Sequence, residues 1–390
     1  MNSIRPPVPI RRRTFIRVLA WNAALLGVGF LAVEAAFGGW LDSVRDPAFW
    51  RLSIYRNVEW TFSAAENYGR IEPVVYRRDR FGLRGDYGAP ENVNILVLGG
   101  STTDERYISE GETWTDTLER CLSGVGRSGR VANAGVAGQS TRGHIHNFEV
   151  WLNHVPGLKP RYVIAYIGLN ERLLDDRRFE DDAERFRETT RSRWLERLKL
   201  NSALYALYRA ASGNWTAWRA GIHHARAQAT GHGETAAQAI DRQWRANDGA
   251  LALVSDEHAR RLGTANTELR DEISAYAKRL ADLANAIRRF GAEPIFVTQT
   301  EAAFRLKDGA VRGDLDRYFA LRAFNDTVMS HCARDGMRCV DLGREFVAAD
   351  GDFYDVVHMT PQGSRKAGEL VCRALLVDPA LAAKTAAPAR

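Results

Sequence analysis

The sequence predicts an α/β protein with a parallel sheet covered by helices on both faces, preceded by one membrane-spanning helix. Short apolar runs, bounded by glycine or polar residues, recur after residue 92 with helical patterns between them, and this alternation predicts the sheet. An arginine-rich start followed by a long apolar run predicts the membrane helix. The five runs expected to form strands are 94–98, 130–133, 162–167, 294–298 and 338–342.

The membrane helix is expected over residues 18–41, an apolar run that only Asn22 and Glu34 interrupt. Its length of roughly 24 residues is enough to cross a bilayer core, which requires about 20. Residues 1–17 hold five arginines and no acid, so they are predicted to stay in the cytoplasm with the bulk of the chain outside. We expect an uncleaved signal anchor. Cleavage near 33–35 and export by a twin-arginine route through Arg12-Arg13 are the alternatives.

The composition excludes several classes of protein. The chain has 390 residues, of which 45% are hydrophobic and 26% charged, so it is not a disordered, collagenous or small disulfide-stapled protein. Its net charge is +6, and the five arginines of the first 17 residues supply most of it. The rest of the chain is close to neutral, which argues against a nucleic-acid partner.

The chain divides into a basic segment, an anchor, a linker and cap, a main domain and a flexible tail, expected at residues 1–17, 18–41, 42–91, 92–378 and 379–390. One crossover of the main domain is unusually long. More than 120 residues separate the third apolar run from the fourth, whereas a crossover needs about a dozen. Residues 172–265 are therefore expected to form a helical insertion over one end of the sheet. The clearest helical pattern follows at 269–290 and ends at Gly291.

Polar and glycine residues follow the predicted strands at the places where open α/β sheets bind ligands. Ser101 comes after two glycines at the end of the first strand, just before a helix. Because the carboxyl ends of parallel strands share one edge, we expect four segments to meet there. The four segments are 99–103, 133–141, 168–171 and 355–361.

The residue types in these segments suit acyl transfer. Ser101 is expected to attack an acyl carbonyl, His358 to accept its proton, and Asp355 to orient the imidazole. The oxyanion needs preorganised donors. We expect the backbone N–H groups of Ser101 and Gly138 and the side-chain amide of Asn170 to supply them.

These segments resemble the blocks of the SGNH/GDSL hydrolase superfamily, in the family's order. The matching residues are Ser101, Gly138, Asn170, His358 and, before the histidine, Asp355. The resemblance covers residues 78–375. It implies a flavodoxin-like three-layer αβα sandwich with a five-stranded parallel sheet, and a Ser-His-Asp esterase or acyltransferase without a metal or organic cofactor. Alignment with the family favours Gly138 over Gly135 as the second backbone donor.

The segment Arg80-Phe-Gly-Leu-Arg-Gly85 is similar to membrane-anchored bacterial members of the superfamily. The chain departs from the family pattern at two places. Gly100 stands where many members have aspartate, a variation that leaves the nucleophile intact, and the long insertion is not part of the minimal fold.

Four cysteines bear on the fold and the compartment. The strand order of such a sheet places the first and last helices side by side, so Cys121 and Cys372 could pair. Cys332 and Cys339 flank a turn and could also meet; four buried free thiols are the alternative. No two cysteines have the spacing of a zinc site.

Three further groups of residues are expected to be structural. Glu171 is predicted to be a solvated acid at a helix start rather than a substrate contact. Three histidines of the insertion are predicted to lie on a solvated surface and not to bind metal: His223, His224 and His232. Four tryptophans of the insertion are predicted to pack among helices rather than stack on sugar rings: Trp194, Trp215, Trp218 and Trp244.

Together these features predict a single-pass protein of the inner membrane with its catalytic domain in the periplasm or outside the cell. The expected activity is a serine esterase that removes small acyl groups, such as acetyl, from an envelope or exported carbohydrate. The alternatives are an O-acyltransferase using the same site and a non-catalytic polysaccharide-binding or scaffold protein that retains the fold.

Overall fold

The computed structural model describes residues 12–40, 54–125, 129–173, 195, 198–199, 201–219, 233–246 and 250–377. It comprises two compact units, one formed by residues 1–51 and 188–226 and the other by residues 52–187 and 227–390. Several sequence predictions fall outside the described residues: the tail 379–390, most of the basic segment, Trp194, and the three histidines His223, His224 and His232.

The larger unit contains the five-stranded parallel sheet that the sequence predicts, in the spatial order β10-β7-β5-β3-β4. The strands are β3 (Val93–Gly99), β4 (Arg130–Asn133), β5 (Tyr162–Tyr166), β7 (Glu293–Val297) and β10 (Arg338–Val340). Val97 on the central strand β3 pairs with Asn133 of β4 and with Ile164 of β5. The chain therefore reverses direction across the sheet between β4 and β5, as in the flavodoxin-like order, and this switch point lies beside β3.

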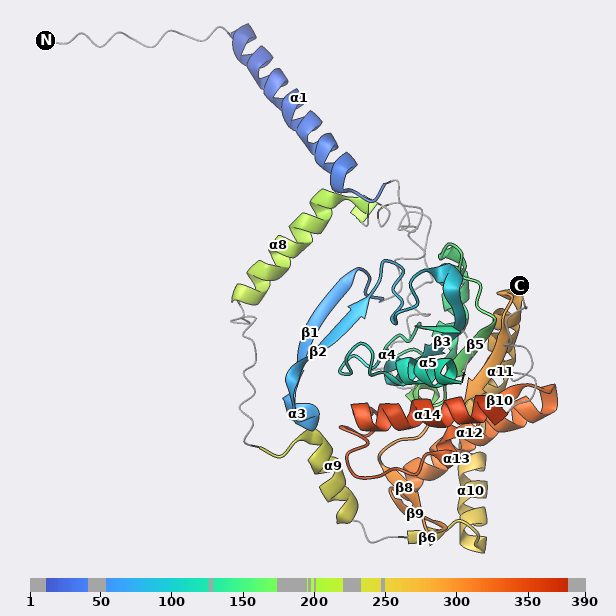
Figure 1. The fold of residues 1–390 in the computed structure, drawn as a ribbon. Helices are drawn as coiled ribbons and strands as arrows, with labels where there is room; N and C mark the ends of the chain where they lie inside the picture. Colours follow the sequence, from blue (N-terminus) through green and yellow to red (C-terminus); the bar gives the residue numbers. More distant parts are fainter. Residues whose placement is uncertain are drawn as a thin grey trace, which may run out of the picture. The chain divides into compact units, whose positions relative to one another are not determined.

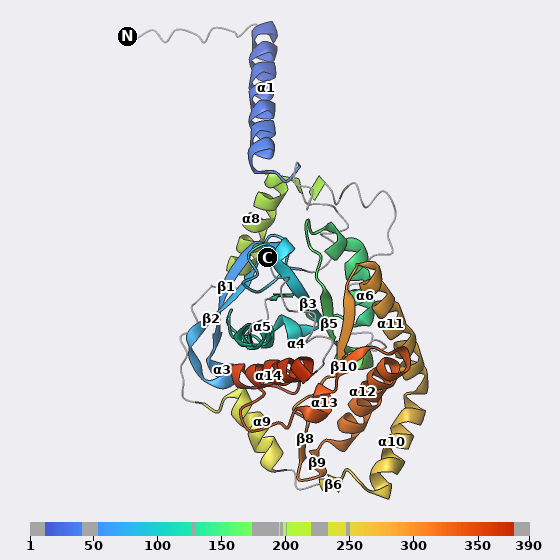
Figure 2. The same ribbon diagram turned by 45° about the vertical axis from the view of Figure 1, so that its right-hand side comes forward.

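Helices cover both faces of the sheet (Figures 1 and 2). The first face carries α5 (Trp114–Gly124) and α14 (Pro361–Val377), and the second carries α6 (Thr141–Val150), α11 (Arg270–Arg289) and α12 (Leu315–Asp335). Successive strand residues point to opposite faces. Ile95 and Val97 accordingly pack in one cluster with Trp114 and Val371 of the first helical layer. This arrangement is the three-layer αβα sandwich expected from the sequence.

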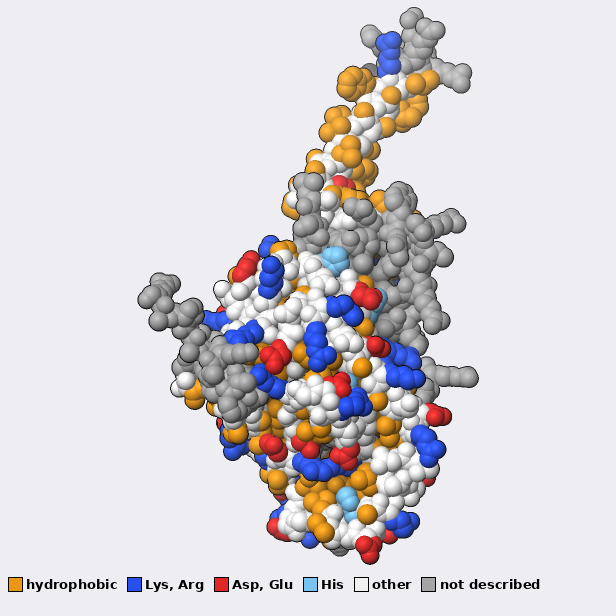
Figure 3. Space-filling view, turned by 90° about the vertical axis from the view of Figure 1, so that its right-hand side faces the viewer, with side chains coloured by type: hydrophobic (Ala, Val, Ile, Leu, Met, Phe, Trp, Pro, Cys, Tyr) orange, Lys and Arg blue, Asp and Glu red, His pale blue; other side chains and the backbone are white. Residues whose placement is uncertain are grey.

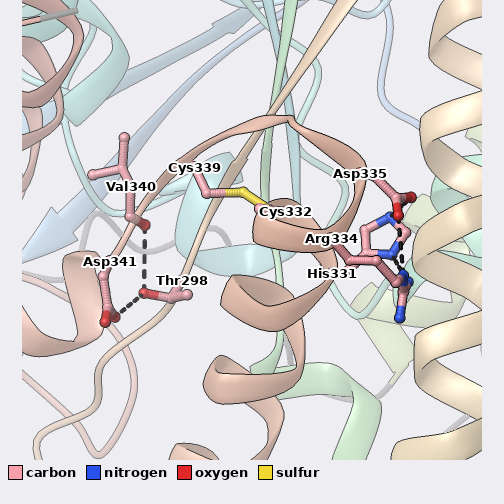
Figure 4. Close-up of a disulfide and its surroundings, with 8 residues drawn as sticks. All are labelled: Thr298, His331, Cys332, Arg334, Asp335, Cys339, Val340 and Asp341. Carbon is pink, nitrogen blue, oxygen red and sulfur yellow. Dashed lines mark hydrogen bonds and ion pairs between the residues drawn. A yellow bond between two sulfur atoms is a disulfide. The ribbon is translucent and has the colours of Figure 1, made fainter.

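Two disulfides tie the helices to their neighbours. Cys121 of α5 is bonded to Cys372 of α14, with a Cα–Cα separation of 6.3 Å, so the first and last helices of the sandwich lie side by side as expected. Cys332, near the end of α12, is bonded to Cys339 of β10 across the turn at Gly336 (Figure 4). Gly336 adopts a left-handed conformation (φ +61°), which lets the helix stop and the chain reverse within a few residues.

The segment expected to be a linker and cap contains an antiparallel hairpin. Its strands, β1 (Val58–Ala64) and β2 (Arg70–Arg78), are joined by the short helix α3 (Ala65–Tyr68) and Gly69. Apolar residues alternate with polar ones along β1, and the apolar residues are the less exposed. A period of two is the signature of a half-buried strand, so the hairpin was recognisable in the sequence. A 3₁₀ turn, Pro90–Asn92, leads from the hairpin into β3.

The insertion is only partly helical. Its described part in the larger unit includes α9 (Ala236–Arg245), the strand β6 (Ala250–Ala252) and α10 (Asp256–Glu268). β6 pairs with β9 (Ala310–Gly313), which also pairs with β8 (Phe304–Lys307), forming an antiparallel sheet that was not among the predicted elements. Strands of three or four residues are too short to show a periodicity. Trp244 of α9 is half-buried, and its indole N–H donates to the Ala302 carbonyl (2.7 Å). Trp215 is 60% exposed, so the prediction that it packs among helices is wrong.

The smaller unit contains α1 (Arg12–Phe37) and α8 (Ala203–Arg219). Residues Phe15–Phe37 of α1 have a mean hydropathy of 1.8, and apolar side chains cover this helix along its length (Figure 3). Such a helix suits a membrane anchor or a signal sequence. Glu34, which interrupts the apolar run, caps α8: its carboxylate accepts from the Ser202 hydroxyl (2.7 Å) and the Leu204 N–H (3.1 Å). α8 therefore belongs with α1 in the smaller unit.

Candidate active site

Ser101 is the first residue of the four-residue helix α4 (Ser101–Asp104), which a single residue, Gly100, separates from the end of β3. The two glycines before it allow close packing. A Cβ atom on Gly100 would lie 2.5 Å from the side-chain nitrogen of Asn170, and one on Gly99 would overlap the Thr103 side chain. The absence of a side chain at Gly100 lets the serine turn contact the Asn170 turn, and its absence at Gly99 lets Thr103 of α4 pack against the end of β3.

The C-terminal loop brings His358 to the serine. His358 Nε2 lies 2.8 Å from Ser101 Oγ, and His358 Nδ1 lies 2.7 Å from Asp355 Oδ2. The other Asp355 oxygen accepts from the backbone N–H groups of Val357 (2.8 Å) and His358 (2.7 Å), a local turn that fixes the carboxylate. With its proton on Nδ1, the imidazole presents Nε2 to the serine hydroxyl as an acceptor. The Tyr354 ring lies nearly parallel to the imidazole, with the two ring centroids 5.7 Å apart.

The environment of Asp355 keeps it ionised. Burial alone would raise its pKa, but the hydrogen bond and charge of the His358 ring and the two backbone N–H groups lower the pKa below its ordinary value. The carboxylate is therefore available to stabilise a protonated His358.

Asn170 and Gly138 lie on neighbouring turns of the same edge. Asn170 donates one side-chain N–H to the Gln139 carbonyl (2.8 Å), and its amide nitrogen carries a second hydrogen for a ligand. Gly138 adopts a left-handed backbone conformation (φ +81°). Within the described residues, the backbone N–H groups of Ser101 and Gly138 donate to no backbone carbonyl. The three residues predicted to supply donors, Ser101, Gly138 and Asn170, therefore lie on neighbouring turns at this edge of the sheet.

Gly135, the alternative to Gly138, is used differently. Its N–H donates to the Asn133 side chain (2.9 Å), and a Cβ atom at this position would lie 2.5 Å from the Asp104 nitrogen. Gly135 thus serves to pack the loop against α4, and its N–H is not available to a ligand.

Glu171 corrects a sequence expectation. It was predicted to be solvated, yet only 3% of it is exposed. Its carboxylate accepts from the Thr141 N–H (2.6 Å) and hydroxyl (3.0 Å), and pairs with Arg279 of α11 (2.7 Å). Burial raises its pKa, while Arg279 and Thr141 act in the opposite direction. The prediction failed because the partner arginine lies 108 residues away in the sequence.

Two buried arginines support the serine helix from behind, and sequence reasoning did not identify their role. Arg78 of β2 donates to Asp104 Oδ1 (2.5 Å), which also accepts from the Tyr76 hydroxyl (2.8 Å). Arg84, in the segment similar to membrane-anchored hydrolases, donates to the carbonyls of Asp104 and Glu105. Arg78 at the end of the hairpin therefore satisfies the Asp104 carboxylate, and Arg84 in the following segment satisfies the free carbonyls at the end of α4.

A comparison of the sequence with protein families identifies the family of this chain. Residues 95–371 match the model of the GDSL-like lipase/acylhydrolase family. The chain therefore belongs to this hydrolase family, and the fold and family predicted from the sequence are confirmed. A search of curated proteins finds no match.

Several solved structures are similar to this chain at low sequence identity. A GDSL-like lipase from Bacteroides thetaiotaomicron is 12% identical with a TM-score of 0.33; the alignment covers 76% of this chain and 92% of that one. A catalytic mutant of the acetylxylan esterase Axe2 from Geobacillus stearothermophilus is 12% identical with a TM-score of 0.36, covering 72% and 91%. The crystal structure of TesA is 14% identical with a TM-score of 0.37, covering 72% and 97%. These likenesses carry no argument about the substrate of this chain.

Proposed function

We propose that this protein is a serine esterase of the SGNH type that removes small acyl groups, such as acetyl, from an envelope or exported carbohydrate. The observation that carries the proposal is the continuous row of contacts from Ser101 Oγ through the His358 ring to Asp355, at 2.8 and 2.7 Å. In this order, the imidazole can accept the serine proton and the ionised carboxylate can stabilise the imidazolium that results, so the serine is activated as a nucleophile.

In the first half of the reaction, Ser101 Oγ attacks the ester carbonyl carbon while its proton passes to His358 Nε2. The carbonyl oxygen becomes an oxyanion, which accepts from the N–H groups of Ser101 and Gly138 and from the Asn170 amide. The tetrahedral intermediate then expels the alcohol, which takes the proton from His358. The acyl group remains on Ser101 as an ester.

In the second half, a water molecule gives a proton to His358 and attacks the acyl carbon. Collapse of the second tetrahedral intermediate releases the carboxylic acid and returns the proton to Ser101. Asp355 holds the ring in one tautomer and stabilises the imidazolium that forms twice in each cycle.

Three observations support the ester chemistry and the location. The family supports ester chemistry. The apolar helix α1 and the arginines before it support an inner-membrane anchor with the hydrolase unit on the periplasmic side. The two disulfides support an oxidising compartment.

Active-site labelling tests the proposal directly. A fluorophosphonate probe should label the full chain in detergent at Ser101, and Ser101→Ala should remove the label. Ser123→Ala changes an exposed serine at the end of α5 and is the matched control, which should label as the wild type does. A labelled Ser101→Ala variant, or an unlabelled wild type, would show that the proposed nucleophile is wrong.

Product analysis then separates hydrolysis from transfer. With an acetylated oligosaccharide and an added acceptor sugar, we expect free acetate and no acetylated acceptor. Acetylated acceptor as the main product would replace the esterase by an acyltransferase with the same acyl-enzyme.

A further inference from the structure

Gln299 follows β7 at the carboxyl edge of the sheet and is almost completely buried, with 3% of its surface exposed. Both ends of its side chain are used. The carboxamide oxygen accepts from the Leu169 N–H (2.6 Å), and the carboxamide nitrogen lies 3.0 Å from the Thr102 hydroxyl, to which it donates. The side chain thus joins two turns that lie 130 and 197 residues away in the sequence.

The two turns carry the nucleophile and one oxyanion donor of the proposed reaction. Thr102 directly follows Ser101, and Leu169 directly precedes Asn170. Within the part of the chain that the structure describes, Gln299 makes the side-chain bridge between the nucleophile turn and the turn that presents the amide donor. It contacts neither reacting group and therefore has no direct chemical role.

The backbone of Gln299 is itself held in place by the side chain of Asn325. Its backbone N–H donates to Asn325 Oδ1 (3.2 Å), and its carbonyl accepts from Asn325 Nδ2 (2.8 Å). Asn325 is buried in α12, and a Cβ atom on Gly343 would lie 2.7 Å from the Gln299 carbonyl oxygen. The carboxamide therefore projects from a backbone that cannot shift without disturbing a packed helix.

We propose that Gln299 is a positioning residue that sets the separation between the Ser101 hydroxyl and the Asn170 amide. The inference rests on the proposed function. Stabilisation of an oxyanion depends on donors preorganised at the right distance, and a displacement of about 1 Å can cost roughly 100-fold in rate. A residue that fixes this distance should affect the transition state more than substrate binding.

The test compares Gln299→Met with Thr298→Val in the full chain. Methionine keeps the length of the side chain and removes both hydrogen bonds. Thr298 is the neighbouring buried residue, and its hydroxyl donates to Asp341 (2.9 Å), as Figure 4 shows. The same hydroxyl accepts from the Gly343 N–H (2.9 Å) and makes no bond to the catalytic turns. Activity is measured on an activated acetyl ester and divided by the number of sites that a fluorophosphonate titrates, so that loss of folded protein does not count as loss of catalysis.

We expect Gln299→Met to lower kcat per titrated site about 100-fold and to change KM less than about twofold, since the oxyanion exists only after attack. Thr298→Val should keep kcat within about twofold of the wild type. If Gln299→Met retains the wild-type kcat, or if Thr298→Val loses as much, Gln299 has only a structural role.

A double-mutant cycle provides a second, milder test. Thr102→Val removes one of the two side-chain bonds of Gln299 and should lower kcat about tenfold. Because both changes break the same contact, the double variant should be no slower than Gln299→Met alone. Additive losses would overturn the proposed link between the two residues. A wild type that neither hydrolyses the ester nor reacts with the fluorophosphonate would instead overturn the proposed function itself.

Discussion

The residues at the catalytic edge fall into two groups, called the front and the back, which differ in their burial and in how far away in the sequence their partners lie. At the front, Ser101 and His358 are partly exposed and lie at a strand end and on a loop before a helix. At the back, Arg78, Glu171 and Gln299 are buried, and their side-chain partners lie 26, 108 and 197 residues away. The front performs the proposed chemistry, while the back holds its turns in place.

The difference teaches where sequence reasoning succeeds. A front residue is recognised by its chemical type and its position after a strand, both of which are local properties. A back residue is an ordinary arginine, glutamate or glutamine until the fold brings it to its partner. We therefore expect substitutions at the front to remove activity with little loss of stability, and substitutions at the back to show effects on stability or positioning.

The largest effect should come from the front. Ser101→Ala and His358→Ala should each lower kcat on an activated acetyl ester by a factor on the order of 10⁵–10⁶, because either change removes the activated nucleophile. Circular dichroism and the unfolding midpoint should stay close to those of the wild type. Near wild-type turnover in either variant would show that the front has been assigned wrongly.

Asp355→Asn should have a smaller effect than loss of the serine. The amide keeps the shape of the side chain but favours the wrong imidazole tautomer, and an equivalent change in a serine-histidine-aspartate site costs about 10⁴-fold in kcat. Steady-state kinetics on the same ester measure the loss. A variant as inactive as Ser101→Ala would indicate that Asp355 does more than orient and stabilise the histidine.

At the back, Arg78→Met should act on stability. Burial raises the pKa of Asp104, but the charges of Arg78 and Arg84 outweigh this effect and lower the pKa below its ordinary value. Removal of Arg78 therefore leaves a buried carboxylate without its main partner. Breaking a buried pair in this way costs about 3–5 kcal/mol in the free energy of unfolding. Urea unfolding followed by tryptophan fluorescence measures the change. Adding Asp104→Asn should recover part of the loss, and a failure to recover any would argue that the pair is not the cause.

The last effect concerns Glu105, the next residue after Asp104, and it depends on pH. Burial raises its pKa from 4.5 to about 8, and the bond from the Trp114 N–H only partly opposes this. Between these two values the folded state holds a proton that the unfolded chain has lost. The stability contributed by this proton is therefore complete below about pH 4.5 and is lost as the pH rises toward 8.

Glu105→Gln should remove this dependence. Relative to the wild type, the variant should gain up to about 1.4 kcal/mol in the free energy of unfolding for each pH unit between pH 5 and pH 8. Urea unfolding at both pH values measures it. A difference that does not change with pH would show that Glu105 is ionised in the folded protein.

Much of the fold could be predicted from the sequence because its signals are local. The β5 run 162–167 is apolar at nearly every position, as a strand buried on both faces must be, and it was located to within one residue. The helix before Gly291 was equally clear. The three-stranded sheet of β6, β9 and β8 was not predicted, because its strands are too short to show alternation and β6 pairs with β9 across about 60 residues. The two-residue turn Asp308-Gly309 between β8 and β9 is a hairpin signal that could have revealed this pair.

The site divides in the same way. The contact of Ser101 with His358 was expected from two short motifs, and the geometry is compatible with the roles proposed for them. The choice between Gly138 and Gly135 could not be made from local spacing, since it depends on the Asn133 side chain that occupies the Gly135 N–H. Glu171 was misjudged for a similar reason, because its burial depends on Arg279.

The most direct test of the account is a crystal structure of the protein after reaction with a fluorophosphonate. We predict a phosphorus atom bonded to Ser101 Oγ, with one phosphoryl oxygen about 2.7–3.1 Å from the Ser101 nitrogen, the Gly138 nitrogen and the Asn170 amide nitrogen. A phosphonyl group on a different residue, or an oxygen directed away from all three nitrogens, would contradict the proposal that these distant segments form one catalytic site.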